Sequence, residues 1–324
     1  MNKKIGKVIK TNNQFPESFL CLYELNDGRI VIGGTDSLII YNIKTQNIDI
    51  KIPLNLKIRT AYELKNNLLF YSGWIGYLEE SDYYCENFLV ELTEKNYVEK
   101  NEIIKQYVNH DIFYKYKNNY FFAGIQPKYG NDLIEKIQLN EKGEFETISK
   151  LEFEKSILST NIPPESYKTY IHFILLKNNT FVVLTKGYLV FYDINTFMKL
   201  KKQKISNAIQ MIELFNEKFI FLCSKDYVEL YDYISFKNIC KISCMYNILL
   251  KIYVSGNKVF IGENLRKYLE LNKCRIVEYE FDNNGCYKQI YEYKNPHKKL
   301  IRDFIQLRDG RLITCSEEYI KIFN

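Results

Sequence analysis

The stretch FLCLYELNDGRIVIGGTDSLIIYN, residues 19–42, decides the fold because the same pattern returns at the end of the chain. Residues 301–324 read IRDFIQLRDGRLITCSEEYIKIFN, with matching apolar positions, the same Asp-Gly-Arg turn and the same final aromatic residue followed by Asn. Short apolar runs separated by such turn residues are typical of antiparallel strands joined by tight hairpins. Self-similarity between distant segments predicts a repeat architecture.

Five further copies lie between these two. Residues 170–193 and 208–232 keep the full pattern and end in Tyr-Asp, and weaker copies begin at Ile58, His110 and Asn247. The copies therefore start at residues 19, 58, 110, 170, 208, 247 and 301. Some are close to the roughly 40 to 45 residues of one four-stranded propeller blade, and the longer ones contain insertions.

The pattern predicts an all-β fold, a seven-bladed β-propeller of four-stranded antiparallel blades in a single domain, residues 1–324. Stacking the blades around an axis removes both apolar faces of each sheet from water, provided that the ring is closed. The last copy stops after its third strand, whereas Ile5–Lys10 (IGKVIK) is a strand-like piece before the first copy. We therefore expect a closing strand within residues 3–11 to join the C-terminal blade.

This arrangement resembles the WD-repeat family over the whole chain. The residues that carry the resemblance are the Asp-Gly-Arg turns, the corners GGTD (33–36) and CSEE (315–318), and the strand ends Tyr192-Asp193 and Tyr231-Asp232. No copy has the Gly-His dipeptide of the family, and Tyr-Asp stands in place of Trp-Asp. The resemblance implies blades with strands a to d from the axis outward. It also implies partner binding on the face that carries the b–c loops and the d–a links.

Charge and composition limit the other classes. The net charge of +6 is spread along the chain, so we expect no nucleic-acid partner. The N-terminus lacks the apolar segment of a secretory signal, and no window approaches the roughly 18 apolar residues of a membrane span. We therefore expect an intracellular, cytoplasmic protein. The eight cysteines show no metal-ligand spacing, and we expect neither metal nor cofactor.

The insertions between strands b and c are the candidate partner-binding segments: residues 73–87, 126–132 and 263–274. The link at residues 154–169, stiffened by Pro163-Pro164, falls on the same face. Large aromatic and cationic side chains dominate the energetics of many interfaces, so the candidates are Trp74, Tyr77, Tyr83, Tyr84, Tyr129, Arg266 and Tyr268. Alternatively, Trp74, the single tryptophan, packs against the rim of its own propeller.

A rival interpretation is an enzyme, or a binder of a small or phosphorylated ligand, with its site in the central channel. The channel candidates are Arg59, Arg302, His110 and His172. An internal salt bridge with Asp111 or Asp303 is the alternative for the arginines, and a structural role is the alternative for His110. No GxSxG, phosphate-binding loop or HExxH motif occurs. We therefore predict a non-catalytic scaffold that docks protein partners, a role compatible with membership of a larger complex.

Overall fold

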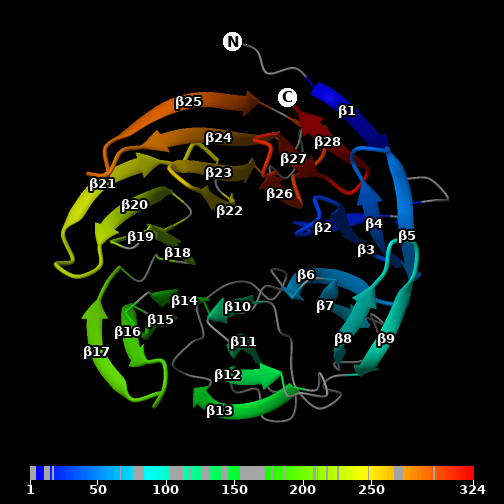
Figure 1. Ribbon diagram of the computed structural model, residues 1–324. Coiled ribbons are helices and arrows are strands. Elements are labelled where there is room, and N and C mark those ends of the chain that lie inside the picture. The colour runs from blue at the N-terminus through cyan, green and yellow to red at the C-terminus, as the bar shows by residue number, and fades with distance from the viewer. Residues whose placement is uncertain are drawn as a thin grey trace. The chain divides into compact units, whose positions relative to one another are not determined.

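The computed structural model describes the greater part of the chain, and every regular element in that part is a strand. The described residues are 5–10, 15–16, 18–65, 67–75, 84–102, 112–116, 119–125, 132–139, 145–153, 172–176, 178–185, 187–206, 209, 211–216, 218–224, 226–246, 248–265, 273–294 and 296–324. Their strands form seven four-stranded antiparallel sheets, which confirms the all-β prediction (Figure 1). The chain divides into two compact units, residues 1–102 with 244–324 and residues 103–243, which are described separately.

The first unit contains four sheets. In three of them the strands pair in chain order, and in the fourth the N-terminal strand β1 pairs with β28. Their strands are β2 (Phe19–Glu24), β3 (Ile30–Gly34), β4 (Ser37–Asn42) and β5 (Asn47–Pro53); β6 (Lys57–Lys65), β7 (Leu68–Ile75), β8 (Tyr84–Leu92) and β9 (Tyr97–Glu102); β22 (Ile248–Ser255), β23 (Lys258–Leu265), β24 (Lys273–Phe281) and β25 (Tyr287–Lys294); and β26 (Asp303–Gln306), β27 (Leu312–Cys315) and β28 (Tyr319–Phe323) with β1 (Ile5–Lys10).

The second unit contains three sheets whose strands all pair in chain order. They are β10 (Ile112–Tyr116), β11 (Asn119–Ile125), β12 (Asp132–Leu139) and β13 (Phe145–Phe153); β14 (His172–Leu176), β15 (Thr180–Thr185), β16 (Tyr188–Asp193) and β17 (Lys199–Lys204); and β18 (Met211–Phe215), β19 (Phe219–Cys223), β20 (Tyr227–Asp232) and β21 (Asn238–Ser243). The first strand of every sheet begins within three residues of a copy start read from the sequence. The assignment of all copies to one domain stays a prediction.

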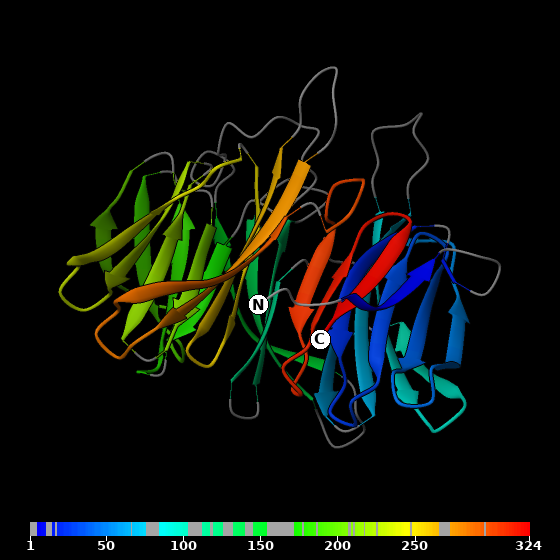
Figure 2. The ribbon, with the colours of Figure 1, turned by 90° about the horizontal axis from the view of Figure 1, so that it is seen from above.

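The N-terminal strand β1 completes the sheet of the last copy. It pairs antiparallel with β28, with Ile9 opposite Ile320 and Lys7 opposite Ile322. Ile9 is 6% exposed and lies in one apolar cluster with Ile320 and Ile322. Figure 2 shows β1, in deep blue, along the red β28. The first and last described strands of the chain are thus neighbours in one sheet.

Both faces of β3 and of β15 are buried because the sheet of each packs between two other sheets of its own unit. On β3, Ile30 and Ile32 belong to the cluster shared with β26–β28, whereas Val31 between them belongs to the cluster shared with β6 and β7. In the second unit, Phe181 and Val183 of β15 contribute to one cluster and their alternating neighbours to the next. Successive side chains of a strand point to opposite faces, so a strand buried on both sides is apolar throughout.

Glycine in the GGTD corner allows neighbouring elements to approach closely. A Cβ atom on Gly33 would overlap Cys21 and Ile58, which belong to the first strands of two successive sheets. A Cβ on Gly34 would overlap Pro16. The GGTD corner therefore requires residues without large side chains, because Cys21, Ile58 and Pro16 approach its backbone closely.

The Asp or Asn that ends the third strand caps the turn that follows it. Asp193 Oδ1 accepts hydrogen bonds from the backbone N–H groups of Asn195 and Thr196, at 2.9 and 2.8 Å. Asp232 repeats the contact with Ile234 and Ser235. These backbone donors hold the pKa of Asp193 below its ordinary value. The aromatic-Asp signature therefore has a local structural role at a turn.

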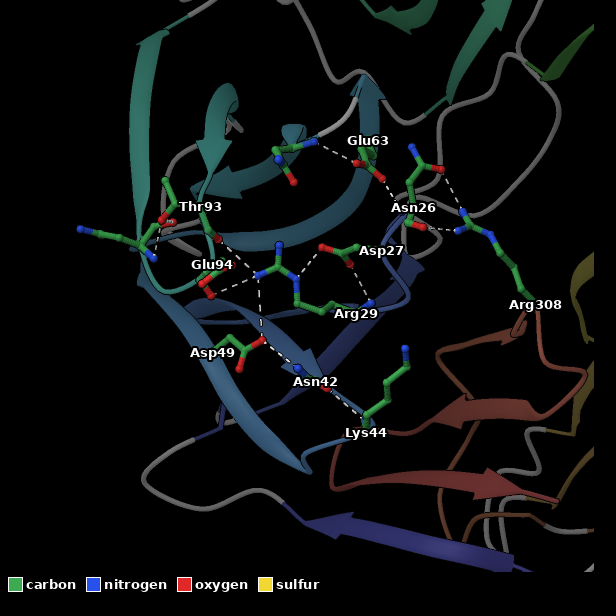
Figure 3. A network of polar contacts seen from close by, with 12 residues as sticks. Asn26, Asp27, Arg29, Asn42, Lys44, Asp49, Glu63, Thr93, Glu94 and Arg308 are labelled. Carbon is green, nitrogen blue, oxygen red and sulfur yellow. Dashed lines mark hydrogen bonds and ion pairs between the residues drawn. The ribbon is translucent and has the colours of Figure 1, made fainter.

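The a–b turns of the first unit bind one another through a repeated contact. The Glu24 carboxylate in β2 accepts the backbone N–H of Arg308, in the turn of the preceding sheet, at 2.9 Å. The equivalent Glu63 in β6 accepts the backbone N–H of Asn26 (Figure 3). The guanidinium of Arg308 also donates to the carbonyl and the side chain of Asn26, at 2.7 and 2.9 Å.

Arg29 of the first Asp-Gly-Arg turn is the buried centre of this network. Its guanidinium pairs with Asp27 at 2.7 Å and donates to the carbonyls of Thr93 and Glu94, at 3.3 and 3.4 Å (Figure 3). Arg29 is 9% exposed. These turns are thus short and fixed by hydrogen bonds and ion pairs with their neighbours.

Candidate partner-binding face

The opposite end of each sheet carries the b–c loops and the d–a links, which include the longest connections. Those between β7 and β8, β11 and β12, β23 and β24, and β13 and β14 span residues 76–83, 126–131, 266–272 and 154–171. The a–b and c–d turns between described strands have at most five residues. The longest connections therefore lie at this end, next to four short b–c loops at residues 35–36, 186–187, 224–226 and 316–318.

The strands that flank the first insertion are longer than the sequence analysis indicated. Trp74 and Tyr84 are strand residues and not loop residues, since Trp74 pairs with Lys57 and Cys85, and Tyr84 pairs with Ile75. Continued backbone pairing extends the hairpin and shortens the predicted 73–87 loop to 76–83. The side chains of Trp74 and Tyr84 lie outside the description, as do residues Tyr77, Tyr83, Tyr129, Arg266 and Tyr268.

Of the channel candidates, the structure describes the side chain of Arg302. Its guanidinium pairs with Glu317, and 45% of the side chain is exposed. Asp303, named above as a possible partner, instead pairs with Lys251 at 2.7 Å and accepts the backbone N–H of Leu22. The expected ion pair of Arg302 thus exists with a different carboxylate. The pairing lowers the pKa of Glu317 below its ordinary value.

The other channel candidates lie in strands or outside the described residues. Arg59 belongs to β6 and His172 begins β14, but their side chains are outside the description. His110, with its neighbour Asp111, lies outside it altogether. The channel site therefore stays a prediction.

A buried ion pair that the sequence analysis missed fixes one d–a link at this end. The Oε2 atom of Glu263 accepts the backbone N–H groups of Met245 and Tyr246, both at 2.8 Å. Its Oε1 atom lies 2.7 Å from Nη2 of Arg275. Glu263 is 2% exposed, whereas Met245 is 68% exposed. The carboxylate thus holds an exposed methionine on the loop-bearing end of the first unit.

A second d–a link is fixed by buried polar groups. Asn264 exchanges two hydrogen bonds with the backbone of Ile301, at 3.0 and 3.1 Å. His297, 2% exposed, places Nε2 2.7 Å from the Thr314 hydroxyl in β27. No described group bonds its Nδ1 atom. Burial lowers the pKa of His297 from 6.5 to about 3, so the ring is neutral at physiological pH.

Because the His297 ring is buried in its neutral form, we expect the protein to lose stability in acid. Below pH 6.5 the unfolded chain binds a proton that the folded ring does not bind until about pH 3. The free energy of unfolding should therefore fall as the pH falls through this window, by at most about 1.4 kcal/mol per pH unit from this group. Urea unfolding at pH 7 and pH 5 should show a larger loss for wild type than for His297→Gln, by about 2 kcal/mol. Equal losses in both proteins would contradict the assignment.

The exposed charges at this end of the first unit are of both signs. Lys299 lies 2.7 Å from Glu318 and 3.7 Å from Glu317, beside the Arg302–Glu317 pair. Such a surface suits a protein partner with mixed charge better than a polyanion. Among the described residues, no group of three or more His, Cys, Asp or Glu side chains is placed to hold a metal ion. Nor does that part of the chain contain a helix able to cross a membrane.

Comparison with known proteins shows the fold. No family model and no curated protein sequence matches the chain. Among solved structures, a chain of a mitotic checkpoint complex superposes with a TM-score of 0.69 at 6% identity, covering 100% of this chain and 92% of that one. The β-propeller domain of Cps50 (Swd1) from Myceliophteria thermophila gives 0.66 at 14% identity, covering 99% of each chain. A putative 6-phosphogluconolactonase from Bacteroides uniformis gives 0.62 at 11% identity, covering 88% of each.

The seven antiparallel sheets and these superpositions define the class of protein. The chain has a β-propeller fold, and its resemblance to WD-repeat propellers is confirmed at the level of the fold. At these identities the likeness does not extend to function.

Proposed function

We propose that this chain is a non-catalytic scaffold that docks segments of partner proteins on the face bearing the b–c loops and d–a links. In this proposal the seven sheets form a closed ring, and β1 fastens the ends of the chain by pairing with β28. The observation that carries the proposal is the contrast between the two ends of the sheets. One end has turns of at most five residues, which bind each other in the first unit, and the other end carries the longest connections together with exposed groups such as Met245 and Arg302.

The energetics of a rigid ring support this role. Buried polar contacts such as Glu263–Met245 and Asn264–Ile301 fix the links in place before a partner arrives. A link that is already ordered loses less conformational entropy when a partner binds than a flexible loop does. Aromatic residues of the insertions, with Trp74 at the end of β7, would supply the large contacts that dominate interfaces. Cys286 is a free and exposed thiol, which fits a cytoplasmic location.

The experiment compares partners of the intact chain with those of a loop-face variant carrying Trp74→Ala, Tyr77→Ala, Arg266→Ala and Tyr268→Ala. Both are purified by affinity from their native cells, and the bound proteins are quantified by mass spectrometry. We expect specific partners to fall by at least about tenfold in the variant, since each interface anchor typically contributes more than about 1 kcal/mol.

A matched variant controls for general effects of four substitutions. It changes Lys44, Thr45, Lys95 and Asn284 to Ala, all of them exposed in c–d turns at the opposite end of their sheets. Its partner list should equal that of wild type, and circular dichroism should show that both variants fold. Identical partner lists for wild type and the loop-face variant would refute docking on this face.

A further inference from the structure

Met245 differs in position from the other apolar side chains of the surface. It is 68% exposed and lies in the d–a link that precedes β22. The other large apolar side chains that are exposed in the described part of the chain lie in outer strands or in c–d turns. Single exposed apolar side chains are common on protein surfaces. Met245, however, lies at the end of the sheets that carries the longest connections.

The link that carries Met245 is fixed through its backbone and not through the methionine side chain. The carboxylate of Glu263 accepts the backbone N–H groups of Met245 and Tyr246, both at 2.8 Å. The ring centre of Tyr246 also lies 5.6 Å from the guanidinium carbon of Arg275, which pairs with Glu263. Any residue other than proline at position 245 could donate the same backbone hydrogen bond. The fold therefore does not require an apolar side chain at this exposed position.

The sheet face that holds this link carries an uncompensated positive charge. Glu263 lies opposite Arg275, and β24 runs from Lys273 to Arg275 without a shift in register. Side chains two residues apart on a strand point to the same face, so Lys273 lies beside Arg275 and nearer to the loop end of the hairpin. The carboxylates of Glu263 and Glu292 on this face both pair with Arg275. Lys273 is exposed, and among the described residues no carboxylate forms a salt bridge with it.

We propose that Met245 and Lys273, as part of the docking function proposed above, bind a protein segment in which an apolar side chain stands next to an acidic residue. The apolar side chain packs against the thioether of Met245, whose unbranched chain adapts to different shapes. The acidic residue pairs with the ammonium group of Lys273. Because the buried Glu263–Arg275 pair already orders the link, binding restricts little additional backbone freedom. A wholly acidic ligand would use Lys273 but would gain nothing from Met245.

The test is a selection of short random peptides, displayed on phage, against the full-length protein, followed by affinity measurements with synthetic copies of the selected peptides. We expect these peptides to share an apolar residue beside Asp or Glu, and their binding to weaken as salt rises. Met245→Ser should lower their affinity by at least about tenfold through lost apolar burial, and Lys273→Glu by at least about tenfold through charge repulsion. Met245→Leu and Lys273→Arg keep the apolar surface and the charge, and should bind about as wild type does.

Met198→Ser and Lys288→Glu are the matched controls. Met198 is 67% exposed in a c–d turn of the second unit. Lys288 is exposed in β25, near the c–d turn of the sheet that contains Lys273. Both controls should bind the selected peptides as wild type does, and thermal unfolding should show that all variants fold.

The outcomes separate this proposal from docking on the loop face in general. Selected peptides that lack an acidic residue, or a selection that yields no peptide, would overturn it. Peptides that bind Met245→Ser as tightly as wild type would also overturn it. If those peptides no longer bind the loop-face variant, the docking face stands and the role of Met245 is wrong. Peptides that bind wild type, Met245→Ser and the loop-face variant alike would count against the docking face itself.

Discussion

An Arg275→Met variant is expected to lose roughly 3–5 kcal/mol of stability because it leaves a buried carboxylate without its cation. Arg275 Nη2 lies 2.7 Å from Glu263 Oε1, and a second contact joins Arg275 to Glu292 at 3.5 Å. Glu263 is 2% exposed, so water cannot replace the guanidinium. The backbone N–H groups of Met245 and Tyr246 remain bound to the carboxylate and offset part of the cost. Urea unfolding followed by circular dichroism measures the loss.

The double variant Glu263→Gln with Arg275→Met separates charge burial from lost packing. Glutamine keeps an acceptor for the backbone N–H groups of the link and removes the charge together with its partner. The double variant should therefore recover much of the stability lost by Arg275→Met, because replacing both members of a buried pair is often nearly neutral. If both variants are equally destabilised, the loss comes from packing and the ion-pair interpretation is wrong.

Replacing Ile9 with Asp is expected to detach the N-terminal strand from the last sheet. Ile9 is 6% exposed and packs in the cluster of Ile320 and Ile322, so a carboxylate there would be buried without a partner. A cost of about 3 kcal/mol or more is expected from lost apolar burial and from desolvation of the charge. Release of β1 would also expose the edge of β28, which favours association between copies. Thermal unfolding and size-exclusion chromatography measure both effects.

Val8 provides the matched control on the same strand. It is 42% exposed and points to the opposite side of the strand from Ile9. Val8→Asp introduces the same charge next to the same backbone pairs and should change stability by less than about 1 kcal/mol. If the two variants unfold alike, the pairing of β1 with β28 does not contribute to the stability of the fold.

Much of the fold could be predicted from the sequence. The copies at residues 19–42 and 301–324 fix the strands through alternating apolar runs, and the turns follow from Asp-Gly-Arg, whose glycine tolerates the positive φ found at Gly28 and Gly310. The missing fourth strand of the last copy pointed to β1, which pairs with β28. These inferences succeeded because strand periodicity and turn chemistry are local properties that a repeat shows several times.

The candidate site could be predicted much less well. Arg302 was identified as a charged residue at a strand start, but its partner is Glu317, which lies in a turn between two other strands. Glu263 fell inside the predicted 263–274 insertion, yet nothing in its neighbourhood indicated that it would bind the backbone of residues 245 and 246. Contacts of this kind depend on how two sheets lie against each other.

Periodicity and turn chemistry in the sequence were enough to predict the seven copies, most of the strands within them, the turns between those strands and the N-terminal strand that pairs with β28. The tertiary structure decided which charges are paired and buried, as at Glu263 and Arg275, and which remain exposed, as at Lys199 and Met198. The difference arises from the distance along the chain over which each kind of interaction acts. Strand and turn preferences act between residues close in the chain, whereas burial and ion pairing depend on distances that packing alone sets.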